Sequence, residues 1–318
     1  MKKECRLKYF PISFFSIIMG LSGLIIATQK MENLLKTTHF FSSYLLYITI
    51  VLFSIIFLIY FIKIIYWRKN VVAEFNNPIK LAFFPTFSIS FLLLSIALSD
   101  INFIISKYFW FFGTVAHLIF TIKIISIWIQ SNKFKITHMN PAWFIPAVGN
   151  ILVPVVGVRY FTPEVSWFFF SIGLIFWLIL LIIFFNRIIF HNPLPDKLLP
   201  TLFILIAPPS VGFISLIKLT GEINNFSKTL YYFALFLTLL LFSQFKMFFK
   251  VRYYLSWWAY LFPIASITIA SVLMFHQTHL LFFRNMFIGL FIVLWIIATI
   301  LFTRTIYAIN QKEICVEE

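Results

Sequence analysis

Charged side chains are scarce in this chain of 318 residues. Asp, Glu, Lys and Arg together make up 11% of it, whereas a soluble domain has about 25%. So few charges cannot cover a water-soluble surface, and they exclude a disordered chain or a charged coiled coil as well. There are two cysteines, Cys5 and Cys315, in the two terminal tails. This number and placement exclude a disulfide scaffold and a thiolate metal site.

Acidic residues are missing from the middle of every long apolar stretch. Transporters driven by protons or sodium ions usually carry a carboxylate near the membrane midplane, and cation channels often use acidic rings. Both mechanisms are therefore disfavoured. The ten acidic residues lie in tails, in loops or at the ends of apolar stretches: Glu4, Glu32, Glu74, Asp100, Glu164, Asp196, Glu222, Glu313, Glu317 and Glu318.

Catalytic patterns are also missing from the sequence. It contains no carboxylate pair, metal-ligand cluster, Gly-rich phosphate loop or nucleophile elbow. Six histidines are scattered, and the closest pair, His276 and His279, has no third ligand nearby. We therefore expect no cofactor, no metal and no enzyme activity. A membrane enzyme or scaffold is the least favoured class of function.

Apolar residues dominate instead and make up 62% of the chain, against about 45–50% in a soluble domain. A helix needs about 20 mostly apolar residues to span a bilayer, and ten runs bounded by charges meet this need. We predict an all-α membrane protein with a single transmembrane domain over residues 1–318. The expected spans are 8–29, 40–66, 82–99, 108–130, 142–159, 164–187, 198–218, 228–249, 255–275 and 282–306.

Proline divides these runs into two kinds. Every intramembrane proline lies in an odd-numbered run, among them the expected kinks at Pro85, Pro208 and Pro263. Proline frees backbone carbonyls that lipid cannot satisfy, so kinked helices belong against protein or a water-filled cavity. The pattern predicts five helical hairpins, with five kinked inner helices around a central pore and five smooth outer helices. The alternative is ten helices around a solid interior.

Hydroxyl side chains also concentrate in the odd runs. Hydroxyls, amides and helix N-termini can replace the hydration shell of an anion. A hydroxyl-lined path in a chain with a net charge of +15 therefore suits an anion. The candidate pore-lining residues are Ser13, Ser16, Thr86, Ser90, Ser210, Ser266 and Thr268.

Two polar residues interrupt the fourth run. His117 and Lys123 point about 240° apart around a helix and do not form a pair. Lys123 either attracts anions or extends along the helix to the interface, as long lysine side chains do. His117 either belongs to an anion site or makes a hydrogen bond between helices.

Lys and Arg are unequally divided between the two sides of the membrane. Most of the 25 lie in the two tails and the even-numbered loops. The positive-inside rule therefore predicts that both termini are cytoplasmic, which requires an even number of spans. We expect this positive charge to face anionic lipid of the cytoplasmic membrane rather than nucleic acid.

Several short segments form an ordered set, of which Trp257-Trp-Ala-Tyr-Leu-Phe-Pro263 is the most specific. The others are Phe10-Pro-Ile-Ser13, Met19-Gly-Leu-Ser-Gly23, Phe83-Phe-Pro-Thr86, Gly113 with Ala116-His-Leu118, Asn140-Pro-Ala-Trp-Phe144, Val148-Gly-Asn150 and Ala207-Pro-Pro-Ser210. Over about residues 8–305 they resemble one family. It comprises the tellurite-resistance protein TehA, the slow-type anion channels of plant guard cells, and related dicarboxylate carriers and sulfite pumps.

This resemblance implies ten helices in five hairpins, a central pore of odd-numbered helices and usually a homotrimer. It also implies that a phenylalanine of the ninth helix closes the pore, and by its position in the motif this is Phe262. The expected function is a passive anion channel or a channel-like exporter of small anions. The alternative is a proton-coupled carrier for a dicarboxylate such as malate, for tellurite or for sulfite.

Overall fold

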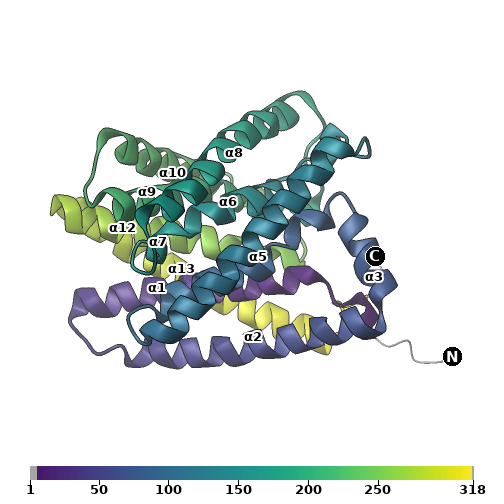
Figure 1. Ribbon diagram of the computed structural model, residues 1–318, viewed down its shortest axis with the longest axis horizontal. Coiled ribbons are helices and arrows are strands. Elements are labelled where there is room, and N and C mark those ends of the chain that lie inside the picture. The colour runs from purple at the N-terminus through teal and green to yellow at the C-terminus, as the bar shows by residue number, and fades with distance from the viewer. Residues whose placement is uncertain (1–5, 317–318) are drawn as a thin grey trace.

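The computed structural model describes residues 6–316, and every regular element in this range is a helix. Within the same range, nine helical segments are long and apolar enough to cross a membrane (Figure 1). They contain α1 (Phe15–Leu35), α2 (Phe40–Tyr66), α4 (Thr86–Leu98), α5 (Phe103–Gln130), α8 (Pro163–Phe190), α9 (Ala207–Thr220), α10 (Asn225–Ser243), α12 (Leu261–Thr278) and α13 (Leu281–Asn310). The predicted all-helical fold is confirmed.

The fifth expected span, 142–159, differs from the prediction because it is short and broken. It consists of a 3-10 turn (η5, Pro141–Trp143), α6 (Phe144–Leu152) and α7 (Pro154–Gly157). Pro154 has no N–H to donate and its ring blocks the preceding turn, so α6 ends before it. The proline then occupies the first turn of α7. All nine residues of α6 are buried.

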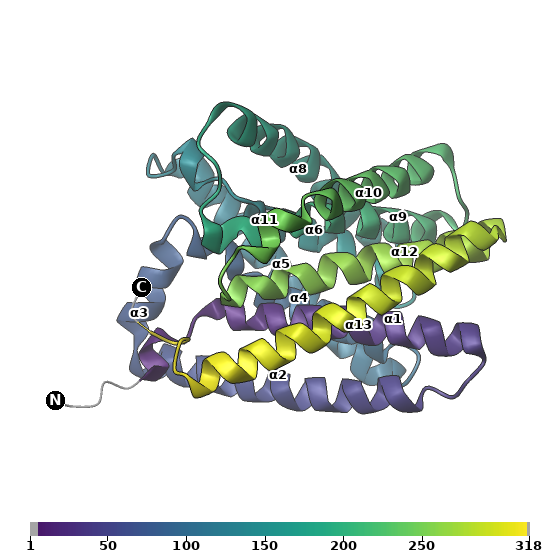
Figure 2. The ribbon, with the colours of Figure 1, turned by 180° about the vertical axis from the view of Figure 1, so that it is seen from behind.

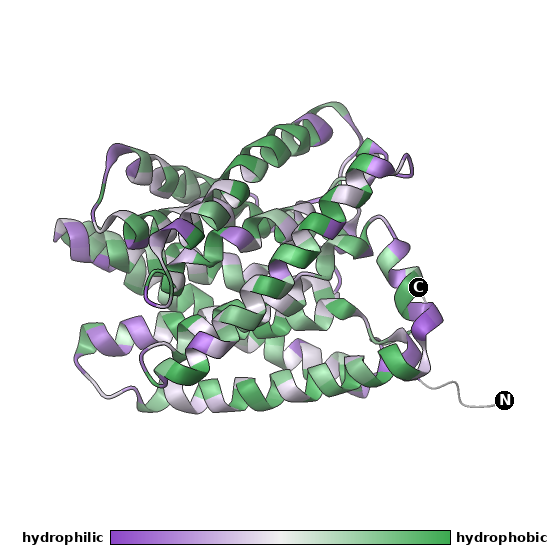
Figure 3. Ribbon diagram, viewed as in Figure 1, coloured by the Kyte–Doolittle hydropathy of each residue, from purple (hydrophilic) through white to green (hydrophobic). Residues whose placement is uncertain are grey.

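The long helices fall into two groups by burial. In the segments that contain α1, α4, α9 and α12, 78–83% of the most apolar stretch is buried. The corresponding share is only 28–39% in α2, α5, α8, α10 and α13. Along α2 the exposed residues are mostly hydrophobic. In the whole molecule, many of the hydrophilic residues lie at helix ends and in loops (Figure 3). Such a surface suits contact with lipid rather than water.

The buried helices follow one another around a closed ring. Each packs against the exposed helix that comes next in the sequence: α1 on α2, α4 on α5, α6 on α8, α9 on α10 and α12 on α13. Among themselves they contact in the order α1, α4, α6, α9, α12 and back to α1. Figure 2 shows α13 running across α12 and α1, both of which it contacts.

Two glycines of α1 allow the contact that closes this ring. A Cβ at Gly20 would lie 3.0 Å from Leu261 Cβ, and a Cβ at Gly23 would lie 2.9 Å from Ala265 Cβ. Small residues let helix backbones approach closely in membrane proteins. The segment Gly20-Leu-Ser-Gly23 therefore lets the first turns of α12 pack closely against α1.

Each buried helix is preceded by a 3-10 segment. Proline marks the transitions: Pro85 immediately precedes α4, Pro208 is the second residue of α9, and Pro263 is the third residue of α12. Backbone N–H groups in the first turn of a helix need no helical acceptor, so proline is tolerated there. The 3-10 segments are η2 (Ile12–Phe14), η3 (Lys80–Phe83), η5, η6 (Asp196–Ile206) and η7 (Leu255–Tyr260).

Short elements complete the end of the molecule where the buried helices begin. The helix α3 (Arg68–Asn76) follows α2 after a break at Trp67, and α11 (Phe245–Phe249) follows α10. Two further 3-10 turns are η1 (Arg6–Tyr9) and η4 (Ile136–His138). The chain leaves α13 at Asn310 and returns toward the N-terminal segment, where Arg6 donates a hydrogen bond to the carbonyl of Ile314.

Candidate functional site

A cavity of about 720 Å³ lies where the N-terminal ends of the buried helices meet. All five buried elements contribute side chains to its wall. These are Ser16 and Met19 of α1, Thr86 and Ile89 of α4, Val148 and Leu152 of α6, Ala207 and Val211 of α9, and Phe262 and Pro263 of α12. Because helix N-termini carry partial positive charge, five of them around one space favour an anion there.

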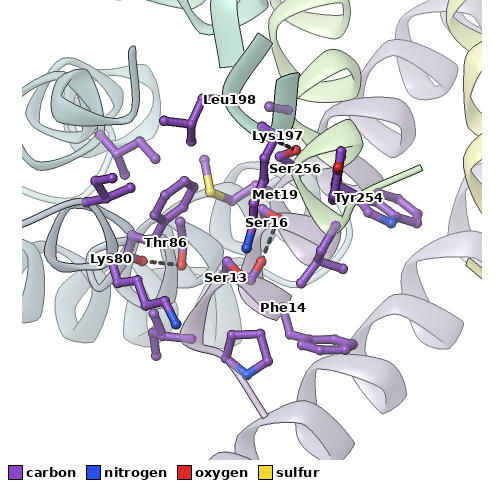
Figure 4. A pocket seen from close by; sticks show the side chains of 18 of the residues that line it. Ser13, Phe14, Ser16, Met19, Lys80, Thr86, Lys197, Leu198, Tyr254 and Ser256 are labelled. Carbon is purple, nitrogen blue, oxygen red and sulfur yellow. Dashed lines mark hydrogen bonds between the residues drawn. The ribbon is translucent and has the colours of Figure 1, made fainter. Parts of the chain in front are cut away.

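Five of the residues expected from the sequence meet in this wall. They are Ser13, Ser16, Thr86, Phe262 and Pro263. Ser13, Ser16 and Thr86 come from neighbouring elements and lie close together (Figure 4). The Ser16 hydroxyl donates to the carbonyl of Ser13 at 2.6 Å, and that of Thr86 donates to Phe83 at 2.6 Å.

The other four hydroxyl residues are buried in the first turns after the proline-marked transitions, away from the cavity lining. Ser210 donates to Ile206 O at 2.8 Å, Ser266 to Pro263 O at 2.7 Å and Thr268 to Ile264 O at 2.7 Å. Ser90 is close to Thr86 O at 2.7 Å and to Phe15 O at 3.2 Å on α1. These hydroxyls satisfy carbonyls of the helix backbone, a common role of Ser and Thr in helices.

Phe262 lies on the cavity wall and is half-buried. Its ring packs against Gly23, where a Cβ would lie 3.2 Å from Phe262 Cδ2. The lining of the cavity reaches Met19, Ile89 and Val211 on the other buried helices. Apolar side chains therefore surround the inner end of this cavity, at the level of Phe262.

His117 lies directly behind the cavity wall. It is fully buried on α5, and Gly149 of α6 separates its ring from the cavity. Its Nδ1 is 2.9 Å from the Ser88 hydroxyl oxygen on α4, and that hydroxyl also lies 2.9 Å from Pro85 O. The Ser88 hydroxyl oxygen therefore lies within hydrogen-bond distance of both the ring nitrogen on α5 and a carbonyl at the start of α4. His117 thus joins α5 to α4 through a hydrogen bond.

Lys123 lies on the opposite side of α5 from the cavity. Its side chain is exposed on the outer surface and does not contribute to the cavity lining. The exposed residues Ile119 and Ile122 lie on the same helix. A lysine among exposed apolar residues extends its charge toward the membrane surface.

The mouth of the cavity carries more positive than negative side chains. Four lysines contribute to the lining: Lys8, Lys63, Lys80 and Lys197. The acidic residues in the described lining are Glu74 and Glu313. Such a surface raises the local concentration of anions. Figure 4 shows Lys80 and Lys197 among the groups around the cavity.

Lys63 and Glu74 form a buried ion pair in this wall, with 2.6 Å between Nζ and Oε2. The sequence did not predict this ion pair, because Glu74 belongs to a polar segment whose composition is typical of a loop. The break at Trp67 turns α3 back, so that Glu74 reaches Lys63 on α2. The only sequence signal is a lysine within an apolar run and a lone glutamate a short distance beyond.

The C-terminal residues Glu313–Val316 cover part of the mouth. Burial raises the pKa of the Cys315 thiol, although the nearby charges of Arg6 and Lys63 act in the opposite direction. Cys315 is therefore a protonated thiol at neutral pH. Cys5, the other cysteine, lies outside the described residues.

Comparison with known proteins identifies the family. The family described as voltage-dependent anion channel matches residues 9–306. The chain belongs to this family. The resemblance found in the sequence motifs is thereby confirmed. The family includes channels and transporters of anions, so membership supports a multi-pass membrane protein that transports anions.

Relatives of this member of the voltage-dependent anion channel family occur in archaea, plants and bacteria. It is 29% identical to an uncharacterized transporter of Methanocaldococcus jannaschii over 308 residues, which cover 88% of this chain and 86% of the relative. It is 30% identical to an S-type anion channel of Arabidopsis thaliana over 271 residues, which cover 83% of this chain and 52% of the channel. A tellurite resistance protein TehA homolog of Haemophilus influenzae is 24% identical over 300 residues, or 90% of each chain. The chain thus spans about half the length of that plant channel.

Proposed function

We propose that this protein is a passive anion channel, or a channel-like exporter of small anions, in the cytoplasmic membrane. In this proposal the ring of buried helices surrounds the anion path, and the cavity is its cytoplasmic half. Both termini are cytoplasmic. The observation that carries the proposal is one cavity lined by all five buried elements, with lysines at its mouth and Phe262 at its inner end.

Phe262 closes the path at the inner end of the cavity. An aromatic ring within an apolar constriction blocks an ion sterically and also expels the water that the ion needs. The close contact with Gly23 supports the ring from behind. Pro263, in the first turn of α12, holds the backbone next to it.

The test is the anion current of the wild type and of Phe262→Ala in planar bilayers under chloride and nitrate gradients. The proposal expects a small wild-type current that rises about tenfold in the variant, equivalent to a barrier lower by about 1.4 kcal/mol. The reversal potential should follow the anion gradient. Phe83→Ala removes another aromatic ring from the cavity wall and serves as the matched control with little expected change. An unchanged current in a well-folded Phe262→Ala protein would refute the gate.

A coupled carrier for a dicarboxylate such as malate, for tellurite or for sulfite is the second candidate. Two observations favour it: the cavity lining does not include the C-terminal ends of α1, α4, α9 and α12, and the imidazole of His117 lies behind that lining. A one-sided cavity is typical of alternating access. Vesicles that accumulate labelled malate or sulfite only under an imposed pH gradient, without passive current, would establish this function.

We also propose a homotrimer. The exposed helices present large apolar side chains along most of their length, which leaves ample surface both for lipid and for other copies of the chain. The mass of the purified protein in a membrane mimetic, measured by light scattering with the detergent contribution removed, tests this assembly. A monomeric mass would contradict it.

A further inference from the structure

The Lys63–Glu74 pair has an unusual position for two opposite charges. Both side chains are almost completely buried, with 3% and 6% exposure, yet both contribute to the wall of the cavity. Burying an ion is costly unless its partners compensate well. The groups that contact these two side chains therefore indicate which kind of ligand this position in the cavity wall can bind.

The Glu74 carboxylate is bound by three different donors. Lys63 Nζ contacts Oε2 at 2.6 Å, the Tyr60 hydroxyl donates to the same oxygen at 3.2 Å, and the Ile12 backbone N–H donates to Oε1 at 2.7 Å. Ile12 is the first residue of the 24-residue helical segment that contains α1. An ammonium, a phenol and the N-terminal N–H of a long helix together form an anion site.

Lys63 has a second contact that does not depend on the carboxylate. Lys63 Nζ also donates to Phe10 O at 2.9 Å, and Tyr60 lies on the same helix as Lys63. Pro11, between Phe10 and Ile12, lines the cavity together with Lys63 and Glu74. If the Glu74 side chain turned away, these donors would still face one point that is next to the cavity.

We propose that Lys63, Tyr60 and the N–H of Ile12 form an anion-binding site that Glu74 occupies as a tethered ligand. A small monovalent anion of the size of nitrate or bromide replaces the carboxylate there on its way through the cavity. This inference rests on the proposed function for its role in transport, but the binding site itself does not require transport. Glu74 then acts as a competitor that keeps the site free of anions while it is seated.

A purely structural pair makes a different prediction. If Glu74 only fastens α3 to the start of α1, its removal weakens the protein and creates no binding site. Glu74→Ala distinguishes the two, because it empties the position and leaves the buried Lys63 charge without a partner. Such an unpaired charge is strongly destabilising, so an anion that enters the site restores stability.

The experiment measures the thermal unfolding temperature of purified protein in gluconate buffer with increasing nitrate. We expect a saturable rise for Glu74→Ala and no comparable rise for the wild type, with apparent nitrate affinity at least about tenfold tighter in the variant. Lys63→Met combined with Glu74→Ala removes both charges and should abolish the nitrate effect. Glu74→Gln, which keeps the side-chain volume, provides a second variant with a smaller rise if Glu74→Ala does not fold.

Two outcomes would overturn the proposal: folded Glu74→Ala and Glu74→Gln proteins that respond to nitrate no more than the wild type, or a response that persists in the double variant. Currents from the same preparations separate this result from the proposed function. A nitrate site without any anion flux refutes the channel and keeps the site. Flux without a gained nitrate response keeps the channel and refutes the site.

Discussion

Gly149 marks the closest approach between the cavity and the polar interior behind its wall. A Cβ at this position would lie 2.1 Å from His117 Cε1 and 2.3 Å from its Nε2. The surrounding backbone has little freedom to adjust, because Thr121 donates to Pro146 O at 2.8 Å and Asn150 donates to Thr121 at 3.0 Å. Glycine at this position is therefore required by packing rather than by backbone conformation.

Gly149→Ala should lower the stability of the protein by about 1–3 kcal/mol, as expected when extra volume enters a well-packed interior. Gly289→Ala is the matched control, since a Cβ there meets nothing within 4 Å. It lies on α13, one of the exposed helices, where alanine is favoured over glycine by about 0.5–1 kcal/mol. Thermal unfolding in detergent, followed by tryptophan fluorescence, compares the two. A Gly149→Ala protein as stable as Gly289→Ala would contradict the packing argument.

At the scale of whole helices, the sequence predicted most of the architecture. The expected span 40–66 coincides with α2 (Phe40–Tyr66). The other eight membrane-crossing segments of the described residues, counted with the 3-10 turns that precede the buried helices, agree with their expected spans within six residues at each end. Proline and hydroxyl content separated buried from exposed helices, because both features need protein neighbours in a membrane. Length alone did not predict the break in the fifth span, which depends on how Pro154 acts within an already buried segment.

The site was harder to predict than the helices. Three of seven proposed pore hydroxyls line the cavity, and the other four donate to or contact carbonyls near the starts of the buried helices. Sequence position does not distinguish these two uses, since a hydroxyl beside a proline suits either. The ion pair of α2 and α3 was missed because it depends on the turn at Trp67, which no periodic pattern reveals.

The contact between α1 and α12 gives a prediction about the proposed gate, Phe262. A Cβ at Gly23 would meet both Ala265 Cβ at 2.9 Å and Phe262 Cδ2 at 3.2 Å. Gly23→Ala should therefore push the ring of Phe262 from α1 toward the cavity and lower the anion current by about twofold to threefold, a barrier change under about 1 kcal/mol. In the Phe262→Ala background there is no ring to displace, so Gly23→Ala should have much less effect. An equal decrease in both backgrounds would mean that the glycine acts through helix packing alone.

At the scale of the whole molecule, positive charge lies at both ends of the ring of buried helices. The cavity mouth has the lysines described above. At the opposite ends of the helices, Arg159 forms an ion pair with Asp100 at 2.8 Å. Burial opposes ionisation of this carboxyl group, but the hydrogen bond from Arg159 and the charges of Lys30, Arg159 and Lys218 outweigh it, so the pKa of Asp100 is lowered. Asp100 is therefore ionised at neutral pH and is protonated only in more acidic solution than an ordinary aspartate.

Asp100 thus reduces the positive potential of three nearby cations, which in the proposed channel lie at the far end of the anion path. Asp100→Asn should raise the anion current at low ionic strength by about twofold, because one negative charge is removed near the ion. The increase should disappear in about 1 M salt, where the screening length falls to about 3 Å.

Glu222→Gln, at an exposed residue that follows α9, is the control and should change the current less. Since acid solution protonates Asp100 itself, the difference between wild type and Asp100→Asn should also shrink as the pH falls below the lowered pKa. A difference that survives high salt and acid would show that the substitution alters the structure rather than the field, and the electrostatic role of this end of the ring would be wrong.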